Sequence, residues 1–182
     1  YGHMSVKIIY FVHGTTKDNE AGKCTGWAGG ELSELGIRQA RELPGLVRDK
    51  SFSALFSSDL KRALDSAQLG FQSLCPIVSD RRLRECDYGD LTQAEESLVD
   101  YAKQIDIPFP GGESLRDVEA RLRSFLEDLK ASHDGKFVAI MAHKAPQLAL
   151  EVILNGKSWE EALAADWRHH KAWQPGWLYN LD

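Results

Sequence analysis

Two apolar runs in this chain each end at a histidine. Residues 7–12 form the first run and lead into His13, and residues 136–142 form the second and lead into His143. Strand-like runs that close on a polar residue place that residue at the carboxyl edge of a parallel sheet, the edge where open α/β sheets bind ligands. The two histidines are therefore expected at a ligand-binding edge.

Strand-like and helix-like patterns alternate along the rest of the chain. This alternation predicts an α/β fold with a mostly parallel sheet. The strands are expected at residues 6–12, 52–56, 77–78, 136–142 and 177–181. Helices are expected at about 59–71 and 145–154, with a shorter one opened by the capping-box pattern of residues 158–161.

Two helices can be predicted in more detail. Apolar residues at helical spacing predict a helix from Ser114 to about Lys130, with Ser114 as its N-terminal cap. Another helix is expected to begin near Ser33, and proline followed by glycine at 44–45 is expected to kink or end it early. Its inward-facing residues are predicted to be Leu35, Ala40 and Leu43.

The length of 182 residues fits one domain, predicted to span residues 4–182. Residues 1–3 stand ahead of a methionine and are interpreted as a tag remnant. The stretch 87–112 has weak periodicity, two prolines and a glycine pair. We expect it to be an excursion over one edge of the sheet, of the kind that can act as a lid.

Composition excludes several classes of partner. The net charge of −5 disfavours sequence-independent binding of nucleic acid, which needs a basic surface. No run approaches the ~20 apolar residues that span a bilayer, so no membrane partner is expected. Three cysteines without paired spacing favour free thiols and a cytoplasmic location. His133, His169 and His170 lack metal-ligand spacing with acidic or cysteine partners, so no metal site is expected.

The loop after the first run is rich in groups that can bind an anion. Glycines and short polar side chains follow His13, among them Gly14, Asn19, Thr25 and Gly26. Such a loop offers backbone N–H groups and neutral donors to a phosphate. Taken alone it also fits an ordinary turn, and His13 alone also fits a hydrogen-bonded structural histidine.

Two charged residues are expected at the same sheet edge. Arg62 falls in the first turn of the helix that follows the second strand, and Glu85 lies in an arginine-rich turn. Glu85 beside Arg82 and Arg84 also fits a surface ion-pair cluster, since exposed pairs are common. Two histidines, an arginine and a glutamate nevertheless converge on one edge.

Together these segments resemble the histidine phosphatase superfamily, the branch 1 or phosphoglycerate mutase-like family. The resemblance covers nearly the whole chain, and its ordered motifs are His13-Gly14, Thr16, Asn19, Gly22, Gly26, residues 32–36, Gln39-Ala40, residues 57–63, residues 83–85, Tyr88-Gly89, residues 110–114 and Ala142-His143. It implies a three-layer α/β/α sandwich with a mostly parallel sheet.

The resemblance also implies roles for particular residues. His13 would attack phosphorus to give a phosphohistidine, and Glu85 would be the general acid and then the base. Arg62, Asn19 and His143 would surround the phosphoryl charge. Gly14, Thr25, Gly26 and Lys144 complete the expected substrate-binding set. No metal or other cofactor is expected.

The chain departs from the family pattern next to both histidines. Most members carry arginine immediately before the nucleophilic histidine, and here the residue is Val12. An acidic residue usually follows His-Gly, where this chain has Thr15, and Lys144 takes a place usually held by a small residue. A bacterial subgroup of the family resembles this chain in its valine and in its tryptophan-rich tail. Candidates to replace the missing charge are Lys144 first, then Lys17, Arg81, Arg82 and Arg84.

The sequence favours a cofactor-independent phosphatase acting on a small phosphorylated metabolite. The alternatives are a catalytically weak module that binds a phosphorylated ligand, motivated by Val12, and a phosphoprotein phosphatase or mutase. Four tryptophans near the C-terminus either pack on the sheet or form a pocket wall: Trp159, Trp167, Trp173 and Trp177. Oligomeric state stays open, with a homodimer as one alternative.

Overall fold

A five-stranded sheet runs through the computed structural model, which describes residues 4–182. The strand order is β3-β2-β4-β1-β5, where β1 is Val6–Val12, β2 Leu55–Ser57, β3 Ile77–Ser79, β4 Phe137–Ala142 and β5 Trp177–Leu181. Only β5 is antiparallel to its neighbour. The predicted mostly parallel sheet is confirmed. The tag-remnant interpretation of residues 1–3 lies outside the described residues.

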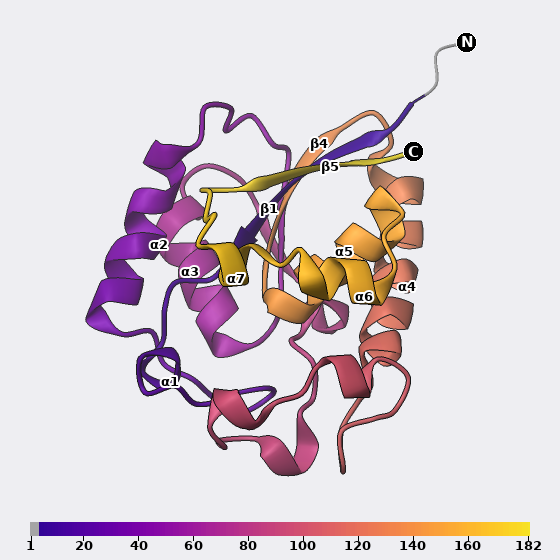
Figure 1. Cartoon of the computed structure of the whole chain (residues 1–182). Helices are drawn as coiled ribbons and strands as arrows, with labels where there is room; N and C mark the ends of the chain where they lie inside the picture. The colour runs from indigo at the N-terminus through magenta and orange to yellow at the C-terminus, as the bar shows by residue number, and fades with distance from the viewer. Residues whose placement is uncertain (1–3) are drawn as a thin grey trace.

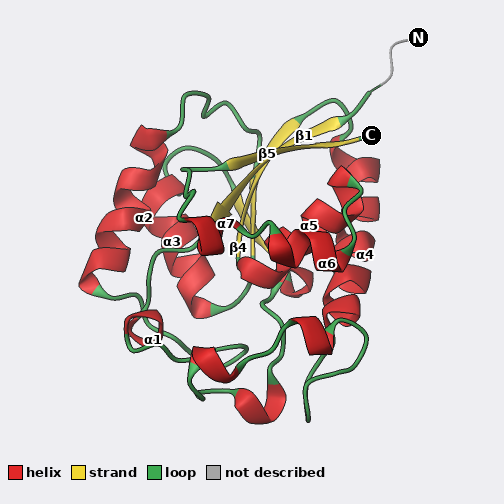
Figure 2. Cartoon of the chain, in the orientation of Figure 1, coloured by secondary structure: helices red, strands yellow, loops and turns green. Residues whose placement is uncertain are grey.

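Helices cover both faces of the sheet and give three layers (Figures 1 and 2). One face carries α2 (Glu34–Leu46) and α3 (Lys61–Phe71), and the other carries α4 (Leu115–His133) and α5 (Lys144–Asn155). Three further helices are short: α1 (Lys17–Glu20), α6 (Trp159–Ala164) and α7 (Trp167–His170). The α/β/α sandwich predicted for this chain is confirmed.

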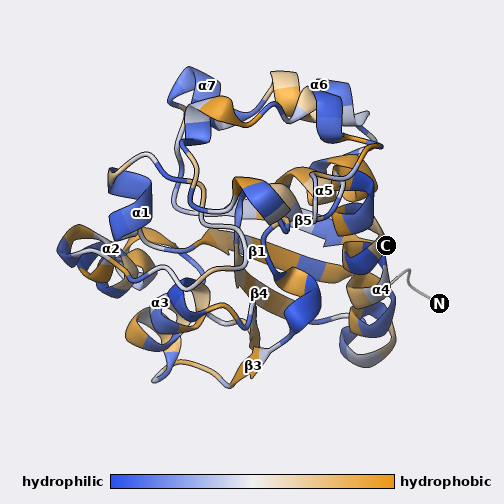
Figure 3. Cartoon of the chain, turned by 90° about the horizontal axis from the view of Figure 1, so that it is seen from below, coloured by the Kyte–Doolittle hydropathy of each residue, from blue (hydrophilic) through white to orange (hydrophobic). Residues whose placement is uncertain are grey.

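Strand alternation divides the core into two clusters. Successive side chains of a strand point to opposite faces, so Ile8 and Tyr10 of β1 pack toward α4 and α5, whereas Ile9 and Phe11 pack toward α2 and α3. Figure 3 shows the apolar strands enclosed between these helix layers. Burial on both faces explains why β1 and β4 read as continuous apolar runs.

The capping serines predicted for three helices are correct, whereas other helix bounds differ by one to three residues. Ser114 caps α4 in a capping box with Asp117, but the helix continues three residues past Lys130, to His133. Ser158 caps α6 in the same way, as predicted. Helix α2 ends at Leu46, directly after the Pro44-Gly45 pair that was expected to kink or end it, and Pro44 itself lies within its last turn.

Two smaller predictions also need correction. Leu35 was expected to face inward, but it is 43% exposed. The buried face of α2 is formed by Gly36, Ala40 and Leu43, and Leu35 lies one residue before Gly36, off that face. Strand β2 begins at Leu55 rather than at Phe52, although Phe52 is buried in the core.

The excursion 87–112 contains three 3₁₀ turns, at Gly89–Leu91, Glu96–Leu98 and Ala102–Gln104, and no α-helix or strand. Its two ends are joined, because the N–H of Glu113 donates to the carbonyl of Asp87 at 2.8 Å. Its middle pairs with the loop after β1, where the Cys24 and Glu96 N–H groups donate to the carbonyls of Ala94 and Gly22. The excursion therefore forms a rim beyond the carboxyl ends of the strands (Figure 1).

None of the helices formed by residues 4–182 has the length and apolar character needed to cross a membrane.

Candidate active site

The register of β1 and β4 brings the two strand-end histidines together. Val12 pairs with Ala142, and the N–H of His13 donates to the carbonyl of Ala142 at 3.2 Å. The imidazole rings of His13 and His143 lie 5.1 Å apart, centroid to centroid. The meeting of both histidines at one sheet edge, expected from sequence, is confirmed.

Hydrogen bonding fixes the tautomer of His13. Its Nδ1 lies 2.7 Å from the carbonyl oxygen of Gly14. A carbonyl can only accept, so Nδ1 carries the proton and Nε2 keeps a lone pair. Burial, followed by the charge of Arg62, lowers the pKa of His13 to about 3. The ring is therefore neutral at physiological pH, with Nε2 free to act as a nucleophile.

Two glycines hold the loop that follows His13 against α2. A Cβ built on Gly14 would lie 2.3 Å from the carbonyl oxygen of Gly36, and one built on Gly36 would lie 1.9 Å from that of Thr15. Only glycine allows the two backbones to approach so closely. Further support comes from Ser66, whose hydroxyl accepts from the N–H of Gly14 at 3.0 Å.

Arg62 is buried, and the first loop fixes its guanidinium. Its Nη2 donates to the carbonyl of Gly26 at 2.7 Å, and its Nη1 donates to those of Ala28 and Gly29 at 3.2 and 3.3 Å. A guanidinium has five N–H donors. Two donors therefore remain for an anion, held in a planar fork that suits phosphate.

The polar side chains of the first loop are fixed as well. The side-chain oxygen of Asn19 accepts from the N–H of Thr16 at 3.1 Å in a capping box, so its NH₂ group is the end that can donate to a ligand. The hydroxyl of Thr25 donates to Asp18 at 3.0 Å.

Glu85 is buried and forms no ion pair with any of residues 4–182. Its Oε1 accepts from the N–H groups of Cys86 and Ala145, at 2.8 and 3.0 Å. Arg82 instead pairs with Asp80 and Asp128, and Arg84 pairs with Asp59. The ion-pair alternative for Glu85 is thus wrong, and these arginines do not supply charge to the site.

His143 lies fully buried behind His13. Its Nε2 is 2.8 Å from the hydroxyl of Ser58, and Tyr10 bonds both its backbone N–H and its carbonyl. Among residues 4–182, its Nδ1 has no hydrogen-bond partner. Burial, followed by the charge of Arg62, holds its pKa well below the usual value, so this ring is also neutral.

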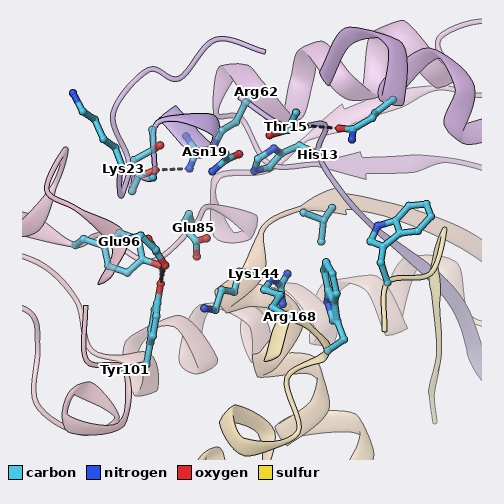
Figure 4. Close-up of a pocket in the computed structure, with 18 residues that line it drawn as sticks. His13, Thr15, Asn19, Lys23, Arg62, Glu85, Glu96, Tyr101, Lys144 and Arg168 are labelled. Carbon is cyan, nitrogen blue, oxygen red and sulfur yellow. Dashed lines mark hydrogen bonds between the residues drawn. The ribbon is translucent and has the colours of Figure 1, made fainter. Parts of the chain in front are cut away.

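A cavity of about 450 Å³ collects most of the predicted site residues (Figure 4). It is lined by His13, Asn19, Thr25, Gly26, Arg62, Glu85 and Lys144, together with Val12. Gly14 lines a neighbouring cavity of about 330 Å³ that shares the side chains of Val12 and His13. In Figure 4, His13, Asn19 and Arg62 lie on one side, Lys144 and Arg168 on the other, and Glu85 between them.

The cavity also contains residues outside the predicted substrate-binding set. Thr15, Gly22, Gln39 and Tyr88 were noted only as motif positions, and Lys23, Glu96, Tyr101 and Arg168 were not predicted to lie in the site. Of the tail tryptophans, Trp167 and Trp173 line the cavity, Trp159 is buried in the core, and Trp177 stacks on Trp167. The pocket-wall alternative therefore holds for two of the four.

The other predicted sources of charge differ in position. Lys17 is exposed and pairs with Glu31, so it does not line the cavity. Lys144 does line it, with its ammonium 4.0 Å from the centre of the Tyr101 ring.

All three cysteines are free thiols, as predicted. Between residues 4 and 182, no three His, Cys, Asp or Glu side chains are grouped as metal ligands.

The comparisons with known proteins agree on one family. Residues 9–174 match the sequence profile of the histidine phosphatase superfamily (branch 1). The chain is 32% identical over 175 residues to a 2,3-bisphosphoglycerate-dependent phosphoglycerate mutase of Methylobacterium sp. (strain 4-46), covering 86% of this chain and 84% of the mutase.

Two solved structures have a similar fold. A mycobacterial glucosyl-3-phosphoglycerate phosphatase aligns with a TM-score of 0.78 at 29% identity, covering 87% of this chain and 86% of that one. The alpha-ribazole phosphatase of Shigella flexneri aligns with a TM-score of 0.74 at 25% identity, covering 87% and 84%.

Proposed function

Because this chain belongs to branch 1 of the histidine phosphatase superfamily, we propose that it hydrolyses a small phosphorylated metabolite through a phosphohistidine intermediate. The observation that carries the proposal is the state of His13. Its Nδ1 proton is held by Gly14, its ring is neutral, and it lines one cavity with Arg62 and Glu85. A nucleophile, an anion-binding fork and a proton donor are thus assembled together.

In the first step, Nε2 of His13 attacks phosphorus and the bond from phosphorus to the leaving oxygen breaks. Protonated Glu85 gives its proton to that oxygen, so the alcohol leaves neutral. Arg62 and the amide of Asn19 donate to the phosphoryl oxygens, whose charge spreads in the transition state. The buried Nδ1 of His143, which lacks a partner among the described residues, can gain one from the same group.

In the second step, water attacks the phosphorus of phosphohistidine. Glu85, now a carboxylate, takes the proton of that water. The bond between phosphorus and Nε2 breaks, which releases inorganic phosphate and restores neutral His13. The N–H groups of Cys86 and Ala145 hold Oε1 of Glu85 in place throughout, and Oε2 is the oxygen that exchanges the proton.

Size and charge support a small substrate. A cavity of about 450 Å³ falls within the range of small-ligand sites. Two structurally similar proteins are phosphatases named for small molecules, glucosyl-3-phosphoglycerate and alpha-ribazole.

The acidic net charge argues against nucleic acid as a partner, and the free thiols support a cytoplasmic location. Light scattering tests the proposed alternative of a homodimer.

Replacement of His13 tests the proposed function. We expect His13→Ala to lose at least a thousandfold in kcat on an aryl phosphate, because the nucleophile is gone. Wild-type protein quenched in acid-free conditions during turnover should carry acid-labile phosphate on His13. His169→Ala removes an exposed histidine and should keep wild-type activity. Full activity in His13→Ala would overturn the proposal.

A mutase is the second candidate, because curated relatives 30–34% identical to this chain are phosphoglycerate mutases. A mutase would pass the phosphoryl group from His13 to a substrate hydroxyl instead of to water. Phosphorus NMR of 3-phosphoglycerate, with and without 2,3-bisphosphoglycerate, separates the two activities. Release of inorganic phosphate supports the phosphatase, and accumulation of 2-phosphoglycerate supports the mutase.

The third candidate is the phospho-ligand-binding module that Val12 motivates. Calorimetry with inorganic phosphate, paired with turnover of an aryl phosphate, tests it. Turnover above ~1 s⁻¹, within the usual enzyme range, excludes the module. Tight binding without turnover would favour it.

A further inference from the structure

Arg168 lines the cavity of His13, although it lies 155 positions further along the chain and belongs to the four-residue helix α7. No motif of the sequence singles it out. Its guanidinium lies across the cavity from Arg62 in Figure 4. The site therefore contains a second guanidinium. This matters because Val12, the residue immediately before His13, carries no charge.

The surroundings hold Arg168 in one orientation. Its Nη1 donates to Asp166 at 2.9 Å and to the side-chain oxygen of Gln147 at 3.3 Å, and its guanidinium lies 4.5 Å from the centre of the Trp167 ring. Asp166 is buried and caps α7. The Nη2 group is buried and has no partner within residues 4–182. A fixed cation with a spare buried donor is prepared for an anionic ligand.

The position of Arg168 indicates which part of a substrate it meets. Arg168 lines the same cavity as His13, and its charge contributes, after burial and Arg62, to the lowered pKa of that histidine. Lys144, on the same wall, instead lies over the ring of Tyr101 in the excursion, with its ammonium 3.8 Å from Asp166. The charge of Arg168 is thus directed at His13, whereas the ammonium of Lys144 lies beside the excursion.

We propose that Arg168 binds a phosphoryl oxygen through Nη2 and forms a clamp with Arg62 on the opposite side. This inference rests on the proposed function. It replaces Lys144 as the first candidate for the positive charge that Val12 does not supply. In this arrangement Asp166 and Gln147 are positioning residues, because they hold the guanidinium without touching the substrate.

Inhibition by inorganic phosphate and by vanadate tests the clamp, because neither anion has a leaving group. A charge-assisted hydrogen bond contributes enough for Arg168→Met to raise both inhibition constants about 10- to 100-fold. We expect kcat/KM for an aryl phosphate to fall about 100-fold or more. Arg168→Lys keeps the charge without the planar fork, so its inhibition constants and kcat/KM should lie between those of wild type and Arg168→Met. Arg123→Met, which removes an exposed arginine of α4, is the control for loss of charge and should match wild type.

The outcomes separate the possible roles of Arg168. Unchanged inhibition constants in Arg168→Met, with a raised KM only for substrates that carry a second charged group, would overturn the clamp and place Arg168 at the leaving group. If Arg168→Met does not fold, wild-type inhibition constants in Arg168→Lys would overturn the clamp equally. A wild-type protein without turnover contradicts the proposed function, whereas phosphate binding measured by calorimetry still tests Arg168.

A double variant gives an independent readout. Val12 lines the same cavity beside His13, so arginine at this position can reach the phosphoryl group from the other side. We expect Val12→Arg to restore phosphate affinity in the Arg168→Met background at least tenfold, and to add little in the wild type. Absence of rescue in a folded double variant would count against a shared role.

Discussion

Arg121 ties the turn that carries Glu85 to α4. Its Nη1 donates to the carbonyls of Arg82 and Arg84, its Nη2 donates to that of Glu85, and both Nε and Nη2 pair with Glu113. The side chain is only 16% exposed. Loss of one partner of a buried pair leaves the other uncompensated, so Arg121→Met should lower the free energy of unfolding by about 3 kcal/mol. Urea denaturation measures this loss.

The same variant should also show that Arg121 positions Glu85. Arg121 does not line the cavity, so the affinity for inorganic phosphate should stay within twofold while kcat falls at least tenfold. Arg123→Met is the matched control on the same helix, because Arg123 is 53% exposed and should cost less than about 1 kcal/mol. A wild-type kcat in Arg121→Met would show that the turn holds without it.

Local sequence context determined which site residues could be predicted. His13, Arg62 and Glu85 stand beside strand ends or in short motifs, so the residues around them in sequence indicate their role. Arg121 and Arg168 act on groups 36 and 155 positions away, through contacts that exist only once the chain has folded. No local pattern distinguishes them from the other arginines of the chain.

At the scale of elements, α2 sets the position of the loop that follows His13. Gly36 lies in its first turn, and alanine there would place Cβ 1.9 Å from the backbone oxygen of Thr15. The loop or the helix must then shift. We expect Gly36→Ala to cost about 1–3 kcal/mol in unfolding free energy, as overpacking usually does. A displacement of about 1 Å at His13 should lower kcat/KM about 100-fold.

Gly45 provides the matched control within the same helix, since a Cβ built on it meets nothing within 4 Å. Gly45→Ala should keep wild-type activity and raise the unfolding free energy by up to about 1 kcal/mol through helix propensity. Thermal denaturation and turnover of an aryl phosphate measure both variants. Gly36→Ala with unchanged activity would show that the close contact does not position the nucleophile.

Helix α2 also shows what the local sequence leaves out of an element prediction. Proline lacks the N–H that bonds four residues back, which is why Pro44 suggested an early end. The carbonyl of Ala40, left without that bond, faces Gly70 of α3, where the absence of a side chain allows close contact between the helices. This contact with α3 is a tertiary feature, and local propensity cannot reveal it.

For the whole molecule, the buried His143 and the partly buried His13 make stability depend on pH. The pKa of His13 is about 3 in the folded chain and about 6.5 when unfolded, and that of His143 is also lowered. Between these values the unfolded chain binds protons that the folded chain does not. The free energy of unfolding should therefore fall as pH decreases from about 6.5 toward 3, by up to about 1.4 kcal/mol per pH unit for each histidine.

Removal of one histidine should reduce this dependence by a definite amount. At about pH 5.5 the unfolded histidine is roughly nine-tenths protonated, so His13→Gln should lower the slope by about 1.2 kcal/mol per pH unit. Urea denaturation at pH 5.0, 5.5, 6.0 and 6.5 measures it, and His169→Gln, at an exposed position, should keep the wild-type slope. Equal slopes in wild type and His13→Gln would mean that His13 is not held neutral by the fold. The desolvation that keeps the nucleophile unprotonated for catalysis is, on this reasoning, the same interaction that makes the folded chain sensitive to acid.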